Sequence, residues 1–534
     1  MGKMNVGFDL STSGKRAMGR MILIIIMGGA LMVCSRDKSG NIVPEGATAG
    51  DMTLEPFVFE TKSGHYNADH GTLIVPETGE KTSSRLIALP VIRIRALADR
   101  PAEPIFYLAG GPGQSNMSFM PPDDLLANHD FVLVGYRGVD GSIRLDCPEV
   151  NRAIKGVGGD LLSSPSLSNL DMAFRQCSER LQTEGIDLDA YTMLDVIRDM
   201  EMARTALGYD RVNLLSQSYG TRIAQIYAYQ HPGFIHRSVM IGVNPPGHFV
   251  WEPDTIDRQI EYYASLCAQD PECSARTSDL VQTIRKVIHN IPSRWIFLPI
   301  DTGKVKLITF ALLYHRNTAA LVFDTFIAAE QGDPSGLALM TLAYDFMFPS
   351  MITWGDLAAK ATSADFDQTR NYTAEMDPPQ SIIGSPFSKL LWSLTEWPTA
   401  TIPEEFRKTQ HSDVETLLLS GSIDFSTPAV FATSELLPRL ANGKQIILAE
   451  MGHTQDLWTV ERSAMIRLLT SFYDTGVADN SLLTYAPMDF HVSWGFPELA
   501  KIALASVLLI VLGITVLIWV IIRRIRRRRV RQKV

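Results

Sequence analysis

Continuous and alternating apolar runs predict strands in the first half of the chain. Between residues 52 and 97, runs such as FVFET and SRLIALPVIRI are broken by Gly, Pro and Asn, as in antiparallel strands. The runs PIFYL, DFVLV, VNLL and RSVMI follow, each apolar enough for a buried strand. Residues 190–208 instead carry apolar positions at helical spacing, with Gly208 as a suitable helix end. Strands alternating with helices predict an α/β fold with a mostly parallel sheet.

This alternation stops in the middle of the chain and later resumes. Residues 248–406 are rich in helical patterns, whereas VETLLLSGSID and KQIILAEMGH restore two strand-and-loop units. We therefore expect a core formed by residues 52–247 and 407–478, interrupted by a helical cap insertion at residues 248–406. One interrupted core explains the returning strands better than two successive domains.

The C-terminal region predicts a membrane anchor. Residues 502–522 carry no charge and, as a helix, are long enough to cross a hydrocarbon core of about 30 Å. Residues 523–534 contain eight basic side chains, and the positive-inside rule keeps such a tail in the cytoplasm. We expect a single-pass anchor in the cell membrane, with the bulk of the chain on the extracytoplasmic side.

Residues 1–34 have the form of an export signal. Lys15, Arg16 and Arg20 precede the apolar run MILIIIMGGALMVC. The run ends at Cys34, a candidate for lipidation, although Val33 stands where acylation sites usually have a small residue. Cleavage, acylation and retention of this segment all stay open.

Charge and cysteine content agree with an exported domain. The net charge is −9 despite the basic tail, so the outer part is acidic, which argues against nucleic acid as a partner. The basic tail suits anionic lipid headgroups. Outside the cytoplasm disulfides persist, and of three possible connectivities we prefer the one that joins Cys147 to Cys177 and Cys267 to Cys273.

A candidate nucleophile follows the VNLL strand. The stretch SQSYG, residues 216–220, leads directly into the helical run TRIAQIYAYQ. This context matches the nucleophile elbow G-x-S-x-G, whose tight turn presents a serine hydroxyl at the sheet edge. Ser216 replaces the first glycine but is small enough for that crowded position, and Gly220 supplies the second. The pattern predicts that Ser218 is a catalytic alcohol; the alternative is a polar loop.

A serine nucleophile needs a base and a group that orients the base. After an elbow, the acid precedes the histidine in the chain. Asp424 follows the strand in VETLLLSG, and His453 follows the strand in KQIIL, so both should lie at the carboxyl edge of the sheet. Asp456 lies only three residues beyond the histidine, and His411 and Asp413 precede a strand, so these three fit less well.

Hydrolysis also needs backbone N–H groups that stabilise an oxyanion. We expect one from Tyr219, directly after the nucleophile, and the other from Gly111 in the glycine turn AGGPG, residues 109–113. The turn lacks the Lys-Ser/Thr ending of a phosphate-binding loop. The predicted chemistry requires no metal and no organic cofactor.

Four blocks together resemble the proline iminopeptidase and tripeptidyl aminopeptidase group of α/β-hydrolases: LAGGPGQS, GYRGVDGS, GYDRVNLLSQSYGTRIAQIYAYQHP, and GSIDFSTPA with MGH. The resemblance covers residues 71–243 and 415–469. It implies the α/β-hydrolase fold, a Ser218–Asp424–His453 triad, and a serine exopeptidase that acts on free peptide N-termini beneath a helical cap.

The chain departs from this group at several positions. Ala109 stands where proline iminopeptidases have His, and Leu394 stands where many relatives have a cysteine. Cap glutamates bind the substrate amine in the group, but no motif places them here. Glu252, Glu261 and Glu330 are the candidates.

Three functions follow from these observations. The first is an aminopeptidase that acts on short peptides outside the membrane. The second is an esterase or lipase-like hydrolase that uses the same triad on esters. The third is a non-catalytic binding protein that keeps the fold, and the complete candidate triad argues against it.

Overall fold

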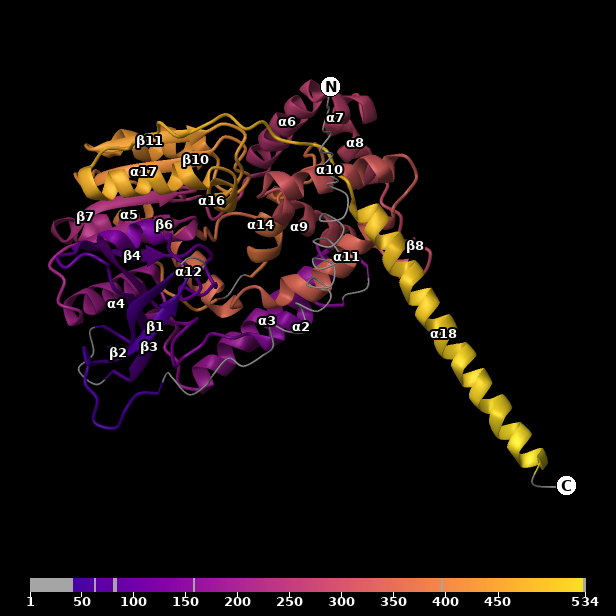
Figure 1. Cartoon of the computed structure of the whole chain (residues 1–534), viewed down its shortest axis with the longest axis horizontal. Coiled ribbons are helices and arrows are strands. Elements are labelled where there is room, and N and C mark those ends of the chain that lie inside the picture. Colours follow the sequence, from indigo (N-terminus) through magenta and orange to yellow (C-terminus); the bar gives the residue numbers. More distant parts are fainter. Residues whose placement is uncertain (1–41, 62–63, 80–83, 157–158, 395–396, 532–534) are drawn as a thin grey trace, which may run out of the picture.

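The computed structural model describes residues 42–61, 64–79, 84–156, 159–394 and 397–531 (Figure 1). Within these ranges nine strands form one sheet, in the order β1-β2-β3-β5-β4-β6-β7-β10-β11. The strands are β1 (Met52–Glu60), β2 (His65–Pro76), β3 (Leu86–Ile94), β4 (Ala102–Leu108), β5 (His129–Val134), β6 (Val212–Gln217), β7 (Ile235–Ile241), β10 (Glu415–Gly421) and β11 (Gly443–Leu448).

The sheet begins antiparallel and continues parallel. The pairs β1–β2, β2–β3 and β3–β5 are antiparallel, and every pair from β5 to β11 is parallel. All six residues of β6 are buried. Because neighbouring side chains point to opposite faces, the centre of the sheet is covered on both sides. The predicted antiparallel start and mostly parallel sheet are confirmed.

Helices that connect these strands belong to the same compact unit. The helix expected at residues 190–208 is α4 (Met193–Ala206), which begins with a capping box between Thr192 and Asp195 and is followed by Gly208 at a φ of 78°. The other helices of this part are α2 (Pro148–Ala153), α3 (Ser164–Thr183), α5 (Tyr219–Gln230), α15 (Ala429–Phe431), α16 (Thr454–Val460) and α17 (Arg462–Thr475).

The segment between β7 and β10 is largely helical, and most of its helices gather at one end of the sheet (Figure 1). A short hairpin interrupts it, and α12 differs from its neighbours because nearly all of its residues are buried. The elements are α6 (Pro253–Gln269), α7 (Pro271–Arg276), α8 (Leu280–His289), β8 (Arg294–Trp295), β9 (Leu298–Pro299), α9 (Thr302–Leu312), α10 (Arg316–Glu330), α11 (Ser335–Met347), α12 (Trp354–Asp365), α13 (Tyr372–Glu375) and α14 (Pro386–Leu391).

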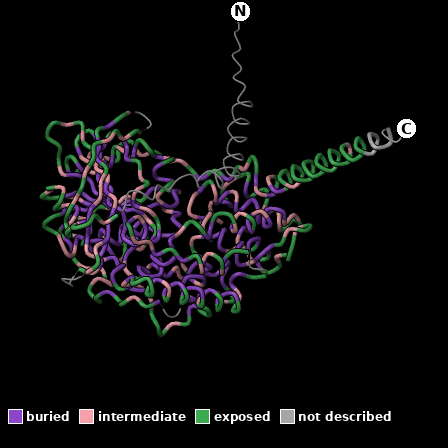
Figure 2. Tube along the Cα trace, turned by 90° about the horizontal axis from the view of Figure 1, so that it is seen from below, coloured by how far each residue is buried: buried purple, intermediate pink, exposed green. Residues whose placement is uncertain are grey.

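A long helix, α18 (Phe496–Arg531), projects from the helical part and away from the sheet (Figure 1). Among the described residues, one unbroken helix is long and apolar enough to cross a membrane, and it is the segment Phe496–Ile525 of α18. Figure 2 shows this helix exposed beyond its first turns, up to the part drawn in grey. Its first turns pack on α11 and α10.

Two disulfides brace the helices. Cys147, which precedes α2, bonds to Cys177 of α3, and Cys267 of α6 bonds to Cys273 of α7. These are the two pairs that the sequence favoured. Cys34 and the rest of the segment 1–34 lie outside the described residues.

Candidate active site

Ser218 lies in a strained turn between β6 and α5. Its backbone has a φ of 51°, which is rare for a residue other than glycine, and its N–H donates to the carbonyl of Ile241 at 2.8 Å. Gly220 allows this turn to fit against β4, because a Cβ there would lie 2.2 Å from the carbonyl oxygen of Leu108. The local backbone geometry is therefore that of a strand-to-helix elbow.

Ser216 occupies the position of the first glycine in the elbow pattern, and its environment accommodates a small polar side chain. The side chain is fully buried in β6, and its hydroxyl donates to the carbonyl of Val239 in the neighbouring strand β7 at 3.0 Å. A buried hydroxyl that finds a partner carries little penalty. Serine is thus accommodated by the sheet itself.

Asp424 and His453 meet at the carboxyl edge of the sheet. Asp424 lies after β10 and His453 lies directly before α16, and the Nδ1 atom of the imidazole is 2.8 Å from the Oδ2 atom of the carboxylate. Both side chains are buried. Because a carboxylate only accepts hydrogen bonds, Nδ1 is the donor, and the other ring nitrogen is left to accept a proton.

The carboxylate itself is held rigidly. Its Oδ1 accepts the backbone N–H groups of Ser426 at 2.9 Å and Thr427 at 2.8 Å, and its Oδ2 accepts the hydroxyl of Thr427 at 2.8 Å. Three donors on two oxygens fix the position of the carboxylate. Asp424 therefore has the surroundings of a residue that orients an imidazole.

The histidine also lies next to the strand end beside the serine turn. A Cβ on Gly242 would lie 2.9 Å from the Cε1 atom of His453 and 3.1 Å from its Nδ1 atom. Gly242 follows Ile241, whose carbonyl accepts the N–H of Ser218. Ser218 follows β6, Asp424 follows β10 and His453 follows β11, so all three predicted residues lie at the carboxyl edge of the parallel part of the sheet.

The alternative residues have other contacts. The carboxylate of Asp456 accepts the backbone N–H groups of Gly452 and Arg316, both at 2.9 Å, and so joins the His453 loop to α10. His411 and Asp413 are exposed and bind each other at 3.0 Å. Their contacts give these residues structural or surface roles.

Cap residues lie over the histidine. The carbonyl of Tyr314 accepts the backbone N–H of His453 at 2.6 Å, and the two rings meet edge to face at 5.3 Å. Burial raises the pKa of the Tyr314 phenol, so it stays neutral. Phe310 connects this tyrosine to Trp251, whose indole N–H donates to the carbonyl of Ser426 next to the acid. Aromatic side chains thus form the cap wall of the site.

The glycine turn after β4 lies against the nucleophile. A Cβ on Gly110 would lie 3.2 Å from the Cβ of Ser218. Gly111 has a φ of 129° and precedes a cis peptide bond to Pro112. Tyr219 is the first residue of α5, so its N–H belongs to the free amides at a helix N-terminus. The assignment of Gly111 and Tyr219 to the oxyanion hole stays a prediction.

Asparagine and aspartate side chains fix the shape of this turn. The Asn116 amide accepts the N–H of Ala109 at 2.7 Å and donates to the carbonyls of Tyr107 and Val134 at 2.9 and 2.8 Å. Asp140, in the loop after β5, accepts the N–H of Asn116 at 2.9 Å. The turn after β4 is therefore tied to the loop after β5.

Sequence reasoning missed a buried ion pair that braces the same turn from α12. Asp356 accepts the N–H of Gly113 at 3.0 Å and binds the ammonium of Lys360, one helical turn further on. That ammonium also donates to the carbonyl of Arg137 at 3.3 Å, and both side chains of the pair are completely buried. Burial raises the pKa of Asp356, and the adjacent ammonium opposes that rise. The sequence signal is an Asp and a Lys four residues apart among small apolar residues.

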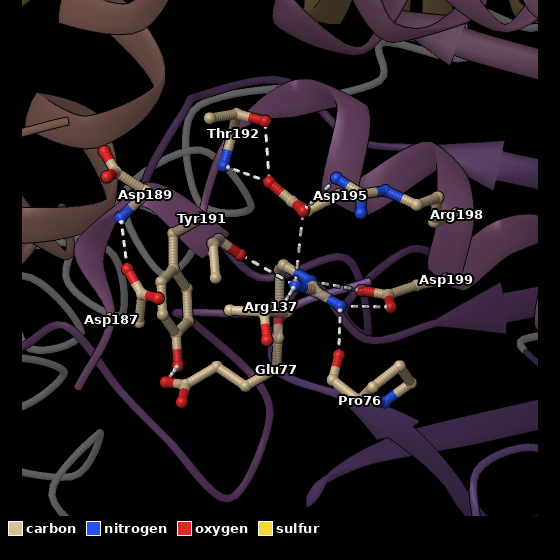
Figure 3. Close-up of polar contacts among 12 residues, drawn as sticks. Pro76, Glu77, Arg137, Asp187, Asp189, Tyr191, Thr192, Asp195, Arg198 and Asp199 are labelled. Atoms are coloured by element: carbon tan, nitrogen blue, oxygen red, sulfur yellow. Dashed lines mark hydrogen bonds and ion pairs between the residues drawn. The ribbon is translucent and has the colours of Figure 1, made fainter. Parts of the chain in front are cut away.

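Arg137 anchors the loop after β5 from its other side (Figure 3). Its guanidinium donates to the carboxylate of Asp199 on α4 at 2.7 and 2.6 Å, and to the carbonyls of Glu77 and Ala190 at 2.8 and 2.7 Å. Asp195 lies 3.7 Å from it. The loop that supports the glycine turn is thus itself held by a buried network.

The candidate cap glutamates have varied surroundings. Glu252 binds Arg370 at 2.7 Å, whereas Glu330 accepts the hydroxyl of Thr283 at 2.6 Å and the ammonium of Lys286 at 3.0 Å. Glu261 is exposed on α6. The charges of the first two are already paired.

Comparison with known proteins agrees with this geometry. The family profile of the alpha/beta hydrolase fold matches residues 103–264. The tripeptidyl aminopeptidase of Streptomyces coelicolor is 26% identical over 206 residues, which cover 36% of this chain and 38% of that protein. The serine protease Hip1 of Mycobacterium tuberculosis is 25% identical over 224 residues, covering 38% and 42%.

The chain thus matches less than half the length of these two curated relatives. Among solved structures, the serine hydrolase of Cycloclasticus zankles aligns with a TM-score of 0.32 at 14% identity, covering 77% of this chain and all of that one. The chain has the α/β-hydrolase fold, and the aminopeptidase and protease relatives support a serine hydrolase.

Proposed function

We propose that the chain is a membrane-anchored serine aminopeptidase that releases N-terminal residues or short peptides through an acyl-enzyme on Ser218. The observation that carries the proposal is the Asp424–His453 hydrogen bond beside the strained Ser218 turn. The similarity to a tripeptidyl aminopeptidase favours peptides with a free N-terminus over other acyl substrates.

The proposed reaction has two halves. The Ser218 hydroxyl oxygen attacks the peptide carbonyl while His453 takes the hydroxyl proton, and backbone N–H groups of Gly111 and Tyr219 stabilise the oxyanion. The histidine then gives that proton to the leaving amine, and the N-terminal fragment stays bound as an ester. A water molecule, deprotonated by the same histidine, hydrolyses the ester and frees the serine. Asp424 keeps the imidazole in the productive tautomer throughout.

The proposed anchor is α18. Its residues 502–522 have the length and composition of a membrane span, and the eight basic residues of 523–534 follow them in the sequence. Trp494, 41% exposed, lies just before the helix, where interfacial aromatic residues are common. The catalytic part would then lie on the extracytoplasmic side, with the tail against anionic lipid.

The test uses the full chain in detergent micelles. The purified protein and its Ser218→Ala variant are assayed on free-amine peptide amides, N-acetylated peptide amides and short-chain esters. Ser434→Ala, an exposed serine on the surface, serves as the matched control. We expect cleavage of free-amine peptides, lost in Ser218→Ala and kept in Ser434→Ala. Turnover of esters alone would mean that the protein is a serine hydrolase that acts on esters instead of peptides. Full activity of Ser218→Ala would refute the mechanism.

A further inference from the structure

An exposed apolar patch lies on the helical part of the molecule. Its residues are distant in the chain from Ser218, Asp424 and His453. Phe346 is 74% exposed, Phe297 is 63% exposed and Met347 is 55% exposed. Contiguous exposed apolar surface usually marks a site of interaction with protein or membrane. The patch consists of Ile296, Phe297, Leu342, Phe346, Met347 and Met351.

The α11 part of this patch belongs to a helix that is apolar on all sides. Leu337, Met340 and Tyr344 are buried on its inner side, whereas Leu342 and Phe346 are exposed on its outer side. A helix that is apolar all round is normally enclosed by protein or by lipid. Here protein covers only one side.

The single charged residue of α11, a helix that the structure describes in full, is paired with groups of the protein. Asp345 binds the buried ammonium of Lys304 at 2.7 Å and accepts the N–H of Gly156 at 3.0 Å. The carboxylate is therefore neutralised by groups on the protein side. Nothing in the sequence of this helix places an unpaired charge on its outer face.

The hairpin β8–β9 adds an apolar tip to the same surface. Ile296 and Phe297 connect its two strands, at positions where polar turn residues are usual. Ile296 has a φ of 56°, an outlier for a β-branched residue. Strain of this kind persists where the surrounding structure or a function requires it. Both strands of the hairpin contact α11.

This surface adjoins the start of α18. Pro497 and Ala500 are buried against the protein and Leu504 is half-buried, whereas residues 505–519 are exposed. The hydroxyl of Ser335, the first residue of α11, donates to the carbonyl of Pro497 at 3.3 Å. The first turns of α18 pack on α11. The helix thus leaves the protein beside α11, the helix that carries Leu342, Phe346 and Met347 of the patch.

We propose that the patch is a second membrane contact, which inserts into the interfacial layer of the bilayer that α18 crosses. The proposal rests on α18 being the anchor, as in the proposed function. Side chains of this kind bury about 5–10 Å into the boundary between headgroups and acyl chains. Contact at two points would fix the orientation of the helical part relative to the membrane, which a single span does not do.

The test places an environment-sensitive NBD fluorophore on single cysteines of the full chain. The Cys34→Ser background removes the one cysteine outside the two disulfides. Met347→Cys probes the patch, and Leu512→Cys probes the span. Val58→Cys is the matched control, because Val58 is an apolar residue with 58% exposure on β1. Each protein is reconstituted in phosphatidylethanolamine–phosphatidylglycerol nanodiscs with and without nitroxide-labelled lipid.

We expect nitroxide lipid to quench the Met347 probe roughly two-fold or more relative to the Val58 probe, as for a side chain within the lipid boundary. The Leu512 probe should be quenched as well. If the Leu512 probe is quenched but the Met347 probe is exposed to water, the patch does not contact the membrane, and α18 remains the anchor. A Leu512 probe in water would overturn both. A Met347 probe shielded from water but not quenched would assign the patch to a protein contact and overturn the lipid assignment.

Discussion

The proposed role of Asp424, which is to orient His453, can be tested by comparison with the surface residue Asp413. Asp424→Asn should lower kcat about 10⁴-fold, because an amide no longer holds the imidazole in the required tautomer. The surface variant Asp413→Asn should keep full activity, since its carboxylate binds only the exposed His411 in the described structure. Steady-state kinetics on the substrate found in the panel, with thermal melts as a check on folding, measures both. Loss of activity in Asp413→Asn alone would reverse the assignment.

The buried Asp356–Lys360 pair should affect the stability of the fold rather than the chemical step. Lys360→Met leaves a buried carboxylate without its counter-charge and should destabilise the fold by about 3–5 kcal/mol. The double variant Asp356→Asn/Lys360→Met removes both charges and keeps an oxygen acceptor for Gly113, so it should regain most of that loss. Urea unfolding measures both variants.

An exposed pair with the same spacing is the control. Glu404 and Lys408 are a solvent-exposed ion pair four residues apart, so Lys408→Met should change the free energy of unfolding by less than about 1 kcal/mol. A cost of Lys360→Met no larger than that of Lys408→Met would mean that the buried pair does not brace the glycine turn.

At the scale of elements, the two disulfides close loops of different length, so their contributions to stability can be compared. Cys147–Cys177 closes a separation of 30 residues, and Cys267–Cys273 closes one of 6. All four cysteines are buried, so replacing each pair by alanines removes similar packing. In the chain-entropy view, the Cys147→Ala/Cys177→Ala variant should lose about 4 kcal/mol and the Cys267→Ala/Cys273→Ala variant about 2 kcal/mol. Equal losses in urea unfolding would contradict the entropic account.

The link between α9 and α14 should depend on pH. Asp377 binds Lys306 of α9 and Lys389 of α14, both at 2.9 Å. Burial favours the neutral acid, but the two ammonium groups outweigh it, and the pKa of Asp377 lies below its ordinary value of 3.8. A lowered pKa means that the stabilisation is present above the ordinary value and lost as pH falls through the folded pKa.

The corresponding variant is Asp377→Asn. Its melting temperature should lie below that of the unchanged protein near pH 7, and the gap should narrow as the pH falls below the ordinary pKa of 3.8. The surface variant Asp413→Asn should show no comparable gap. A gap that stays constant across the titration would mean that the carboxylate charge does not supply the stabilisation.

Which elements the sequence predicts depends on how local their signals are. VNLL followed by SQSYG predicts a strand and an elbow because the turn chemistry is written in consecutive residues. The same holds for α4, whose cap and terminal glycine flank it directly. The spacing of Asp356 and Lys360 is a weaker signal, because a pair four residues apart usually lies on a solvated helix face. Their burial depends on contacts with Gly113 and Arg137, which are more than two hundred residues away in the chain.

At the scale of the molecule, the structure separates a folded body from an exposed helix. The buried and half-buried residues at the start of α18 end at Leu504, and residues 505–519 are exposed. The composition of residues 502–522 predicted a span, but only the fold reveals that it leaves beside α11 rather than beside the sheet. The apolar patch could not be predicted either, because α11 reads as an ordinary buried helix in the sequence.

This separation predicts what truncation does. A chain that ends after Ala505 keeps the contacts of Pro497, Ala500 and Leu504 with the body, so its melting temperature and hydrolytic rate should be unchanged. It should be extracted from membranes by alkaline carbonate, because a patch held at the interface binds reversibly whereas a span does not. Removing only residues 523–534 keeps the span and should leave the protein resistant to carbonate. If the chain truncated after Ala505 also resisted extraction, the anchor would have to lie elsewhere in the chain.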